Sequence, residues 1–190
     1  YIIIMDTNRR IKISKKMSYY LRHGLDKLTP DSAGYVKINE LLSLDDFVGV
    51  KKEEILKEVE VNEKKRFGLD STGEKIRANQ GHSLVSGALV DESKLLKKII
   101  EPLGYCVHGT RKEHLDKINA TGLNRMNRTH IHFAIKPTAI SGFRGSSNVL
   151  IHIDMKKAME DGIEFYLSEN DVILCQGPID PKYFSKIQIL

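Results

Sequence analysis

Apolar residues recur at helical spacing in three stretches of the first half of the chain. One stretch follows Ser14, a predicted N-cap, and ends at Gly24, a predicted stop signal. A second helix is predicted to begin near Asn39, directly after residues 34–38, which alternate like a short strand. A third amphipathic helix is predicted over residues 51–62. The chain is therefore expected to open with three helices.

The stretch after the third helix has the pattern of a β-hairpin. Residues 66–69 and 75–78 are strand-like and flank the turn-forming residues 70–74. Three helices followed by a hairpin is the order of a winged helix, a fold that commonly reads nucleic acids but does not by itself establish a function. The apolar run at residues 1–5 is too short to cross a bilayer and lacks a signal-peptide layout, so an edge strand is predicted there.

The second half of the chain has short apolar runs in place of long amphipathic ones. Residues 83–93 are predicted to be a linker. Strands are predicted at residues 105–108, 131–134, 149–153, 164–166 and 172–175, with helices at residues 112–120 and 156–161. This α+β pattern predicts a second lobe with a mainly antiparallel or mixed sheet. We therefore expect two domains, residues 1–83 and residues 84–190.

The distribution of charge points to an anionic partner. The 190 residues are 41% apolar, which suffices for a core, and their formal net charge is +5. Six of the first 23 residues are Lys or Arg, against the single acid Asp6. A solvated basic tail and a nucleic-acid contact explain this cluster equally well. The two cysteines, Cys106 and Cys175, lack the spacing of a disulfide framework, which favours a reducing, intracellular compartment.

Candidate anion-binding groups in the first half are Arg22, His23 and Arg66. Arginine presents a fixed fork to phosphate oxygens, and histidine moves protons near neutral pH. Each group also has a purely structural explanation. Arg22 and His23 end a predicted helix, whose dipole favours cations there, and residues 64–66 fit a solvated run of charge.

The second half offers groups suited to a ribose or an amide. His108-Gly109-Thr110 ends a strand, where glycine lets a ligand approach the backbone and the side chains offer hydrogen bonds. Residues 141–148 form a loop around Arg144 that suits an anion and equally an ordinary turn. His130 and His132 share one face of a predicted strand, which raises zinc as an alternative, although no cysteine or carboxylate spacing completes such a site.

These stretches follow one another in the order of a known family. The chain resembles the RNA 2′-phosphotransferases, tRNA-splicing enzymes that act on the 2′-phosphate left at a ligated junction. The resemblance runs from about Ser14 to the C-terminus. The matching stretches are Ser14-Lys15, Tyr19-Tyr20-Leu21-Arg22-His23, Gly34-Tyr35-Val36, Glu40-Leu41-Leu42, Lys65-Arg66-Phe67, Gln80-Gly81-His82-Ser83, His108-Gly109-Thr110, His130-Ile131-His132-Phe133 and residues 142–149.

The resemblance implies an α+β fold, with an N-terminal winged-helix lobe that binds RNA followed by a C-terminal ADP-ribosyltransferase-like lobe that binds NAD. The family's catalytic residues correspond here to Arg22, His23, Arg66 and Arg144. The implied NAD contacts are His108, Gly109, Thr110, His132, Ser141 and Gly142, and the expected RNA contacts are Lys15, Lys16 and Lys65. An apolar residue near Val172 stands where many ADP-ribosyltransferases carry Glu, which argues against a protein-modifying relative.

In the implied reaction, an internal 2′-phosphate of RNA attacks the nicotinamide riboside of NAD and displaces nicotinamide. The ADP-ribosylated RNA then yields 2′-hydroxyl RNA and ADP-ribose 1″,2″-cyclic phosphate, without a metal. The phosphate is expected between Arg22, His23 and Arg66 on one side and Arg144 on the other. The expected enzyme is an intracellular monomer that acts on tRNA, cytoplasmic or, in a eukaryote, also nuclear, with no membrane partner.

Three rival functions stay open. An ADP-ribosyltransferase that caps RNA ends would use the same first step. A non-enzymatic winged-helix nucleic-acid-binding protein would leave the second lobe unexplained. A two-histidine phosphoesterase needs two His-x-Ser/Thr motifs, and His108-Gly109-Thr110 is the one such motif in the sequence. A requirement for NAD separates the phosphotransferase from the second and third rivals.

Overall fold

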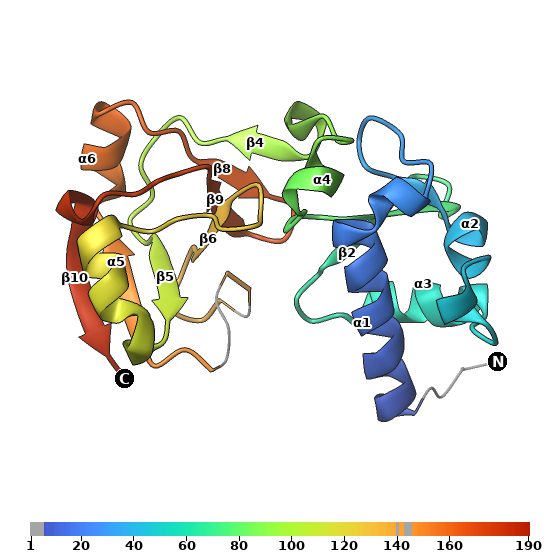
Figure 1. The fold of residues 1–190 in the computed structure, drawn as a ribbon. Helices are drawn as coiled ribbons and strands as arrows, with labels where there is room; N and C mark the ends of the chain where they lie inside the picture. The colour runs from blue at the N-terminus through green and yellow to red at the C-terminus, as the bar shows by residue number, and fades with distance from the viewer. Residues whose placement is uncertain (1–5, 140, 143–145) are drawn as a thin grey trace. The chain divides into compact units, whose positions relative to one another are not determined.

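The computed structural model describes residues 6–139, 141–142 and 146–190, so the edge strand expected at residues 1–5 lies outside the described residues. The chain is mixed α+β and divides after Leu95 into two compact units (Figure 1). Unit 1, up to Leu95, has helices and a small sheet. Unit 2, Leu96–Leu190, is built on a larger antiparallel sheet.

Unit 1 contains the three predicted helices and the predicted hairpin. Its helices are α1 (Thr7–His23), α2 (Ile38–Leu42), α3 (Lys52–Val61) and α4 (Leu84–Gly87), with the 3-10 helices η1 (Leu25–Lys27), η2 (Asp45–Phe47) and η3 (Glu92–Lys94). Strands β1 (Val36–Lys37), β2 (Phe67–Leu69) and β3 (Lys75–Ala78) form an antiparallel sheet of order β1-β3-β2. The apolar faces of these elements make the core, in which Met17, Leu21, Ile55 and Ile76 are fully buried.

Helix α1 begins earlier than its apolar pattern indicated. Asp6, not Ser14, is its N-cap, since the Asp6 carboxylate accepts the backbone N–H of Arg9 at 3.1 Å. The first turns are polar, yet Arg9 Nη2 donates to Glu54 Oε2 of α3 at 2.8 Å. This pairing with a buried carboxylate stabilises the polar first turns, which the apolar pattern did not reveal. The prediction of Ser14 as N-cap was therefore wrong.

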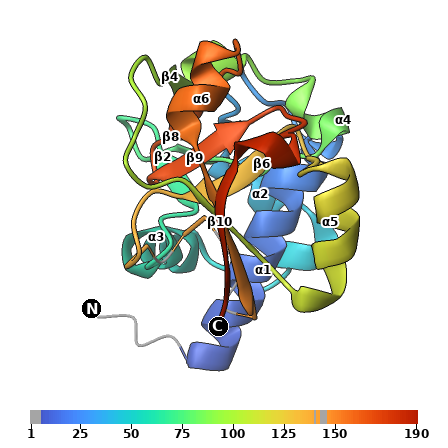
Figure 2. The same ribbon diagram turned by 90° about the vertical axis from the view of Figure 1, so that its left-hand side faces the viewer.

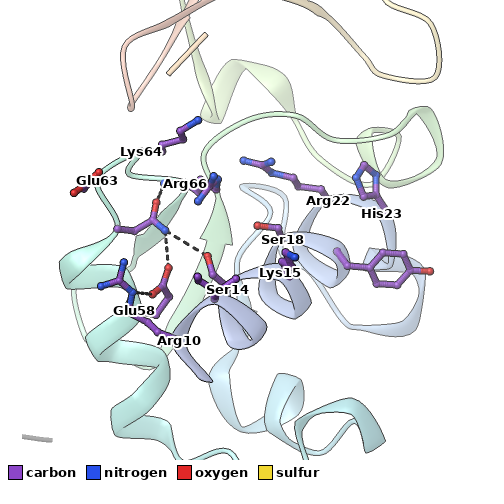
Figure 3. A pocket seen from close by; sticks show the side chains of 13 residues that line it. Arg10, Ser14, Lys15, Ser18, Arg22, His23, Glu58, Glu63, Lys64 and Arg66 are labelled. Atoms are coloured by element: carbon purple, nitrogen blue, oxygen red, sulfur yellow. Dashed lines mark hydrogen bonds and ion pairs between the residues drawn. The ribbon is translucent and has the colours of Figure 1, made fainter. Parts of the chain in front are cut away.

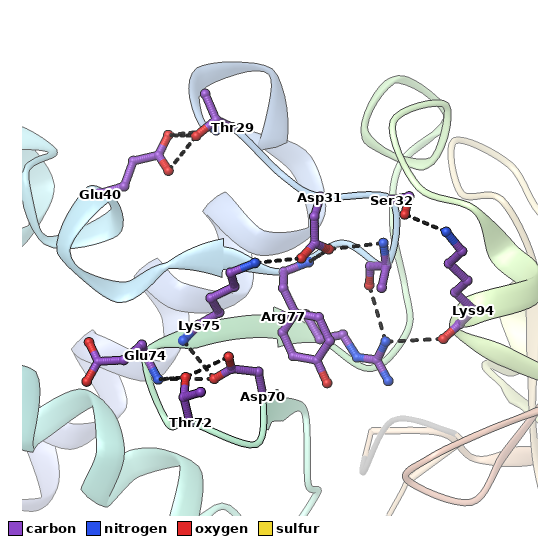
Figure 4. A network of polar contacts seen from close by, with 12 residues as sticks. Thr29, Asp31, Ser32, Glu40, Asp70, Thr72, Glu74, Lys75, Arg77 and Lys94 are labelled. Atoms are coloured by element: carbon purple, nitrogen blue, oxygen red, sulfur yellow. Dashed lines mark hydrogen bonds and ion pairs between the residues drawn. The ribbon is translucent and has the colours of Figure 1, made fainter.

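The segment expected to be a linker packs onto unit 1 instead. The Ser86 hydroxyl of α4 accepts the backbone N–H of Leu25 at 3.4 Å, and Ser86 is fully buried. The guanidinium of Arg77 on β3 donates to the carbonyl of Lys94 at 3.3 Å, within a larger polar network (Figure 4). These bonds attach residues 84–95 to unit 1, which is why the division falls after Leu95 and later than the predicted boundary.

Unit 2 is organised by one antiparallel sheet with the strand order β10-β7-β5-β6-β9-β8-β4. The strands are β4 (Leu96–Lys98), β5 (Val107–Thr110), β6 (Ile131–Ala134), β7 (Val149–Ile153), β8 (Tyr166–Ser168), β9 (Val172–Cys175) and β10 (Phe184–Ile189). The helices are α5 (Leu115–Thr121), α6 (Met155–Glu160) and the 3-10 helices η4 (Lys112–His114) and η5 (Pro181–Tyr183). Figures 1 and 2 show β10 at one edge of this sheet.

Most strands of unit 2 were predicted from their apolar runs. Strands β6, β7 and β9 have the predicted bounds, whereas β5 and β8 begin two residues later than predicted. The pairings are antiparallel throughout the described sheet, in agreement with the expected antiparallel or mixed sheet. Strands β4 and β10, which occupy the two edges, were not predicted.

The core of unit 2 is aromatic and aliphatic, and Phe133, Ile151, Phe165 and Ile173 are fully buried in it. Its cysteines, Cys106 and Cys175, are free buried thiols, and burial raises the pKa of Cys175 to about 11. No helix in the described part of the chain is both long and apolar enough to span a membrane.

Candidate functional site

A cavity of about 540 Å³ opens beside α1 in unit 1 (Figure 3). The lining residues of α1 come in pairs four positions apart: Arg10 and Ile11, Ser14 and Lys15, Ser18 and Tyr19, Arg22 and His23. The rest of the lining comes from the end of α3 and the turn before β2: Glu58, Asn62, Glu63, Lys64 and Arg66. Because residues four apart on a helix share one face, α1 presents a continuous stripe to this cavity. We call it the α1 pocket.

Arg22 is held in the pocket from two sides. Gly24 ends α1 as predicted, so Arg22 lies in the last turn, where its carbonyl accepts the Ser83 N–H at 2.9 Å. Gly81 has a φ of +88°, and a Cβ there would lie 3.4 Å from the guanidinium carbon of Arg22. Glycine adopts this φ without strain and leaves the space beside the guanidinium open. The segment from Gly81 to Ser83 therefore braces the helix end that carries Arg22.

Arg66 follows a tight turn that Asn62 organises. The Lys65 N–H donates to the Asn62 carbonyl at 2.7 Å, and the Arg66 N–H donates to the Asn62 side-chain oxygen at 3.2 Å. Lys65 itself has a φ of 43°, in the left-handed region. The side-chain amide of Asn79, the residue after β3, donates to the Lys65 carbonyl at 2.9 Å and supports the turn. Together these bonds direct Arg66 into the pocket.

Asn62 also ties this turn to both helices of the pocket. Its side-chain nitrogen donates to Glu58 Oε1 of α3 at 2.6 Å and to the Ser14 hydroxyl of α1 at 3.4 Å (Figure 3). Glu58 is almost fully buried and pairs with Arg10 at 3.3 Å. Asn62 is 7% exposed, so water has little access to these bonds. The network connects α1, α3 and the turn before β2.

The pocket is rich in cations. Arg10, Lys15, Arg22, Lys64 and Arg66 line it, against the acids Glu58 and Glu63. Burial, and secondarily the charge of Arg66, lowers the pKa of Lys64, as expected where positive charges are concentrated. His23, also in the lining, is exposed. The arrangement can bind a phosphate and present to it a side chain able to transfer a proton.

The structure thus places Arg22, His23 and Arg66 around one pocket, along with Lys15. Two other predicted RNA contacts are not in the lining. The Lys16 ammonium donates to the backbone carbonyl of Asp46, and Lys65 is exposed in the turn. The fourth predicted catalytic residue, Arg144, lies outside the described residues.

In unit 2, His108 has a defined tautomer. Its Nδ1 lies 3.0 Å from the backbone carbonyl oxygen of His132. A carbonyl can only accept, so Nδ1 carries the proton and Nε2 of the neutral ring is a hydrogen-bond acceptor. Burial lowers the pKa of His108, which keeps the ring neutral at physiological pH. His108 can therefore accept a hydrogen bond from a hydroxyl group.

The other residues predicted to bind NAD gather around the same two strands. Gly109 and Thr110 follow His108 on β5, which pairs with β6. Gly142 has a φ of +100°, and a Cβ there would lie 2.6 Å from the Ala134 Cα, so residues 141–142 run against the end of β6. Val172 pairs with Ala134 and is fully buried, so it is an apolar core residue.

The zinc alternative finds no support in the described residues, which contain no group of three or more His, Cys, Asp or Glu side chains placed to hold a metal. His130 is buried, with Nδ1 at 2.9 Å from the Thr129 hydroxyl and its ring edge-on to Tyr166. These contacts account for His130 as a core side chain.

Several lining residues escaped the sequence interpretation. Asn62 carries no motif, and its role depends on bonds to α1, α3 and the turn. Ser14 was interpreted as a cap rather than as a pocket residue. A signal was nevertheless present, because polar residues at Arg10, Ser14, Ser18 and Arg22 repeat every fourth position, which marks one face of a helix.

Comparisons with known proteins agree with the motifs. A profile described as "RNA 2'-phosphotransferase, Tpt1 / KptA family" matches residues 8–177. A putative tRNA 2′-phosphotransferase of Schizosaccharomyces pombe is 40% identical over 97% of this chain, which spans about half (53%) of that protein. tRNA 2′-phosphotransferase 1 of Danio rerio is 39% identical over 97% of the chain and 88% of the relative. A probable RNA 2′-phosphotransferase of Nostoc punctiforme is 36% identical over 96% of the chain and the relative's whole length.

The match to the family extends well beyond half of the chain and includes both units. It takes in Arg22, His23 and Arg66, which the fold brings to one cationic pocket, and the strands that carry His108 and His132. This chain therefore belongs to the RNA 2′-phosphotransferase, Tpt1 / KptA, family.

Proposed function

We propose that this chain removes an internal 2′-phosphate from RNA, with tRNA as the natural substrate, and transfers it to NAD. The observation that carries the proposal is the meeting of Arg22, His23 and Arg66 in one cationic pocket, although Arg66 lies more than forty residues from the other two in sequence. The products are 2′-hydroxyl RNA, nicotinamide and ADP-ribose 1″,2″-cyclic phosphate.

We assign unit 1 to a winged-helix fold that binds the RNA, and unit 2 to an ADP-ribosyltransferase-like fold that binds NAD. The order of three helices and a hairpin supports the first assignment. The antiparallel sheet with His108 and His132 on neighbouring strands supports the second. Two free cysteines support an intracellular enzyme.

The phosphate is held by groups that do not titrate near neutral pH. A 2′-phosphate is a dianion, and the Arg22 and Arg66 guanidinium groups offer it paired donors. Lys15 and Lys64 add positive charge to the same pocket. The family motif assigns a third arginine, Arg144, to this phosphate. Because the attacking group is already an anion, the first step needs positioning and no general base.

NAD is a co-substrate that supplies an electrophilic ribose carbon and, next to it, a hydroxyl that finally receives the phosphate. We assign His108, Gly109, Thr110, His132, Ser141 and Gly142 to its binding. The residues fit a dinucleotide, because Nε2 of His108 is an acceptor suited to a ribose hydroxyl. Gly109, which follows His108 on β5, has no side chain to keep a ligand from the backbone. Gly142 lets residues 141–142 approach the end of β6 closely. The proposal assigns no metal.

The second step requires a proton. When the ribose hydroxyl attacks phosphorus, the bond from phosphorus to the RNA 2′-oxygen breaks, and overall one proton moves from the attacking hydroxyl to the departing oxygen. That oxygen would leave as an alkoxide, so it needs a proton donor. We assign this role to His23, which is exposed in the pocket, while Arg22 and Arg66 stabilise the charge on the phosphoryl oxygens.

The test uses a short RNA with one internal 2′-phosphate, incubated with the full chain with and without NAD. Loss of the 2′-phosphate is expected with NAD, together with one nicotinamide and one cyclic phosphate for each RNA processed. Phosphate release without NAD would indicate a phosphoesterase. Nicotinamide release with ADP-ribose retained on RNA ends would indicate a capping transferase, and RNA binding without turnover would indicate a non-enzymatic protein.

A further inference from the structure

The α1 pocket is larger than one phosphate requires. Its volume of about 540 Å³ falls in the range of sites that enclose whole small ligands, roughly 300–1,000 Å³. The lining of α1 extends from Arg10 to Arg22, a length of about 18 Å at 1.5 Å per residue. The phosphate ligands Arg22 and His23 stand at one end of this stripe, so the pocket has room for the nucleotides around the phosphate.

Tyr19 is the aromatic residue of this lining, and the residue is 51% exposed. Its ring centre lies 6.2 Å from that of His23, so it stands beside the proposed proton donor. Large apolar rings are usually covered in a soluble unit, and this one is exposed among cations. An exposed aromatic ring in a cationic pocket is the combination with which proteins bind unpaired nucleotides.

The Tyr19 ring has a rigid support behind it. It packs edge-on against the ring of Tyr20, with centres 5.2 Å apart and an interplanar angle of 88°. Tyr20 is buried, donates its hydroxyl to Asp46 Oδ2 at 2.6 Å, and packs its ring 5.8 Å from that of Phe47. A ring supported in this way is preorganised for a flat partner, because little of its freedom remains to be lost on binding.

We propose that Tyr19 stacks on a nucleobase adjoining the 2′-phosphate and so makes the α1 pocket a nucleotide site rather than a phosphate site. The inference rests on the proposed function and adds a substrate contact to it. Stacking involves the face of a base and not its edges, so Tyr19 would accept any of the four bases. It would favour RNA that is unpaired at the phosphorylated position, because a paired base is already stacked.

The first test compares kcat/KM for 2′-phosphate transfer in Tyr19→Ala, Tyr19→Phe and wild type. Base–aromatic stacking is worth about five- to 150-fold in affinity, so Tyr19→Ala is expected to lose kcat/KM within that range, mainly through KM. Tyr19→Phe keeps the ring and is expected to stay within about twofold of wild type. Val48→Ala, which truncates an 82% exposed side chain outside the pocket, is the matched control and is expected to be unchanged.

The second test removes the base instead of the ring. Two RNAs carry a 2′-phosphate and an abasic residue, one at the phosphorylated nucleotide and one at its 3′ neighbour. For one of these RNAs, the abasic change is expected to lower the kcat/KM of wild type about as much as Tyr19→Ala lowers kcat/KM on intact RNA. With Tyr19→Ala as the enzyme, the same abasic change is expected to lower kcat/KM little further, because the two changes remove the same contact.

Three results would overturn the stacking contact. The first is full activity of Tyr19→Ala, and the second is that the losses of kcat/KM from removing the ring and the base multiply for both RNAs. The third is a loss in Tyr19→Phe equal to that in Tyr19→Ala, because the hydroxyl rather than the ring would then be responsible. Wild type that leaves the 2′-phosphate on intact RNA in the presence of NAD would instead refute the proposed function, so the two failures are distinguishable.

Discussion

Asn62 provides a sharp test of how the pocket is built, because one truncation removes three hydrogen bonds at once. Asn62→Ala deletes the donor to Glu58 at 2.6 Å, the donor to Ser14 at 3.4 Å and the acceptor of the Arg66 N–H at 3.2 Å. The carboxylate of Glu58 stays buried and keeps only Arg10 among the partners described above. The substitution therefore weakens both the stability of unit 1 and the placement of Arg66.

The magnitude follows from the three bonds. A hydrogen bond to a charged group contributes about 1.5–3 kcal/mol, and the two neutral bonds contribute less, because they are longer and neither partner is charged. The free energy of unfolding of unit 1 is expected to fall by roughly 2–4 kcal/mol. Asn79 still supports the turn, so Arg66 shifts rather than leaves. A shift of the order of 1 Å at a catalytic group can cost about a hundredfold, so kcat/KM is expected to fall about 10- to 100-fold.

The assay combines urea unfolding, followed by far-ultraviolet circular dichroism, with phosphate-transfer kinetics at a temperature where the variant is folded. If the two units unfold separately, one transition moves to lower urea and the other stays. Asn39→Ala, an exposed asparagine on α2, is the control and is expected to change neither measurement. Wild-type stability would refute the bonding argument. Lost stability with unchanged kcat/KM would refute the role of Asn62 in placing Arg66.

Further predictions concern other parts of the molecule. His23→Ala is expected to slow the second step more than the first, by about a hundred- to ten-thousandfold, and to accumulate RNA carrying ADP-ribose on its 2′-phosphate. A single-turnover time course in which nicotinamide release falls as far as final product would contradict this role. Gly81→Ala, with φ +88° beside Arg22, is expected to lower both the melting temperature and kcat/KM, whereas Gly73→Ala, with φ +70° and open space, lowers only the melting temperature. Equal kcat/KM in the two glycine variants would show that Gly81 does not affect activity through Arg22. Because burial lowers the pKa of His108 from about 6.5, the folded chain binds fewer protons than the unfolded chain below that pH. Stability is therefore expected to be lost as the pH falls below about 6.5, and thermal melts of His108→Gln are expected to show a smaller pH dependence there. RNA affinity is expected to fall with rising salt, as cations of the pocket release counterions from the RNA, and binding that is insensitive between low and moderate salt would exclude this electrostatic contribution.

Local patterns in the sequence determined much of the secondary structure. Strands β6, β7 and β9 were predicted with their bounds, because each is a compact apolar run that becomes buried in the middle of a sheet. The hairpin β2–β3 was predicted because turn-forming residues separate two strand-like stretches. In these segments the local preference and the tertiary environment agree, so the sequence alone is enough to predict the secondary structure.

Elements whose stability comes from a distant partner were missed or misplaced. Within the described residues, β4 pairs on one side, with β8, and β10 pairs with β7, so neither edge strand needs a continuous apolar run. The first turns of α1 lack an apolar face, and they are helical in part because Arg9 reaches Glu54 of α3. The segment after Ser83 has the composition of a linker, yet it is attached by bonds from Leu25 and Arg77.

In the candidate site, too, some features follow from the sequence and others from the tertiary structure. The sequence by itself determined the chemical groups, because Arg22, His23, Arg66 and the strands with His108 and His132 are recognisable as motifs. Only the tertiary structure decided which of them share a pocket and what holds them there. Lys15 lines the pocket and Lys16 does not, because their side chains leave α1 in different directions. The role of Asn62 depends on α1, α3 and the turn before β2 meeting around its buried side-chain amide. Such positions are set by long-range packing, which a local pattern of residues does not encode.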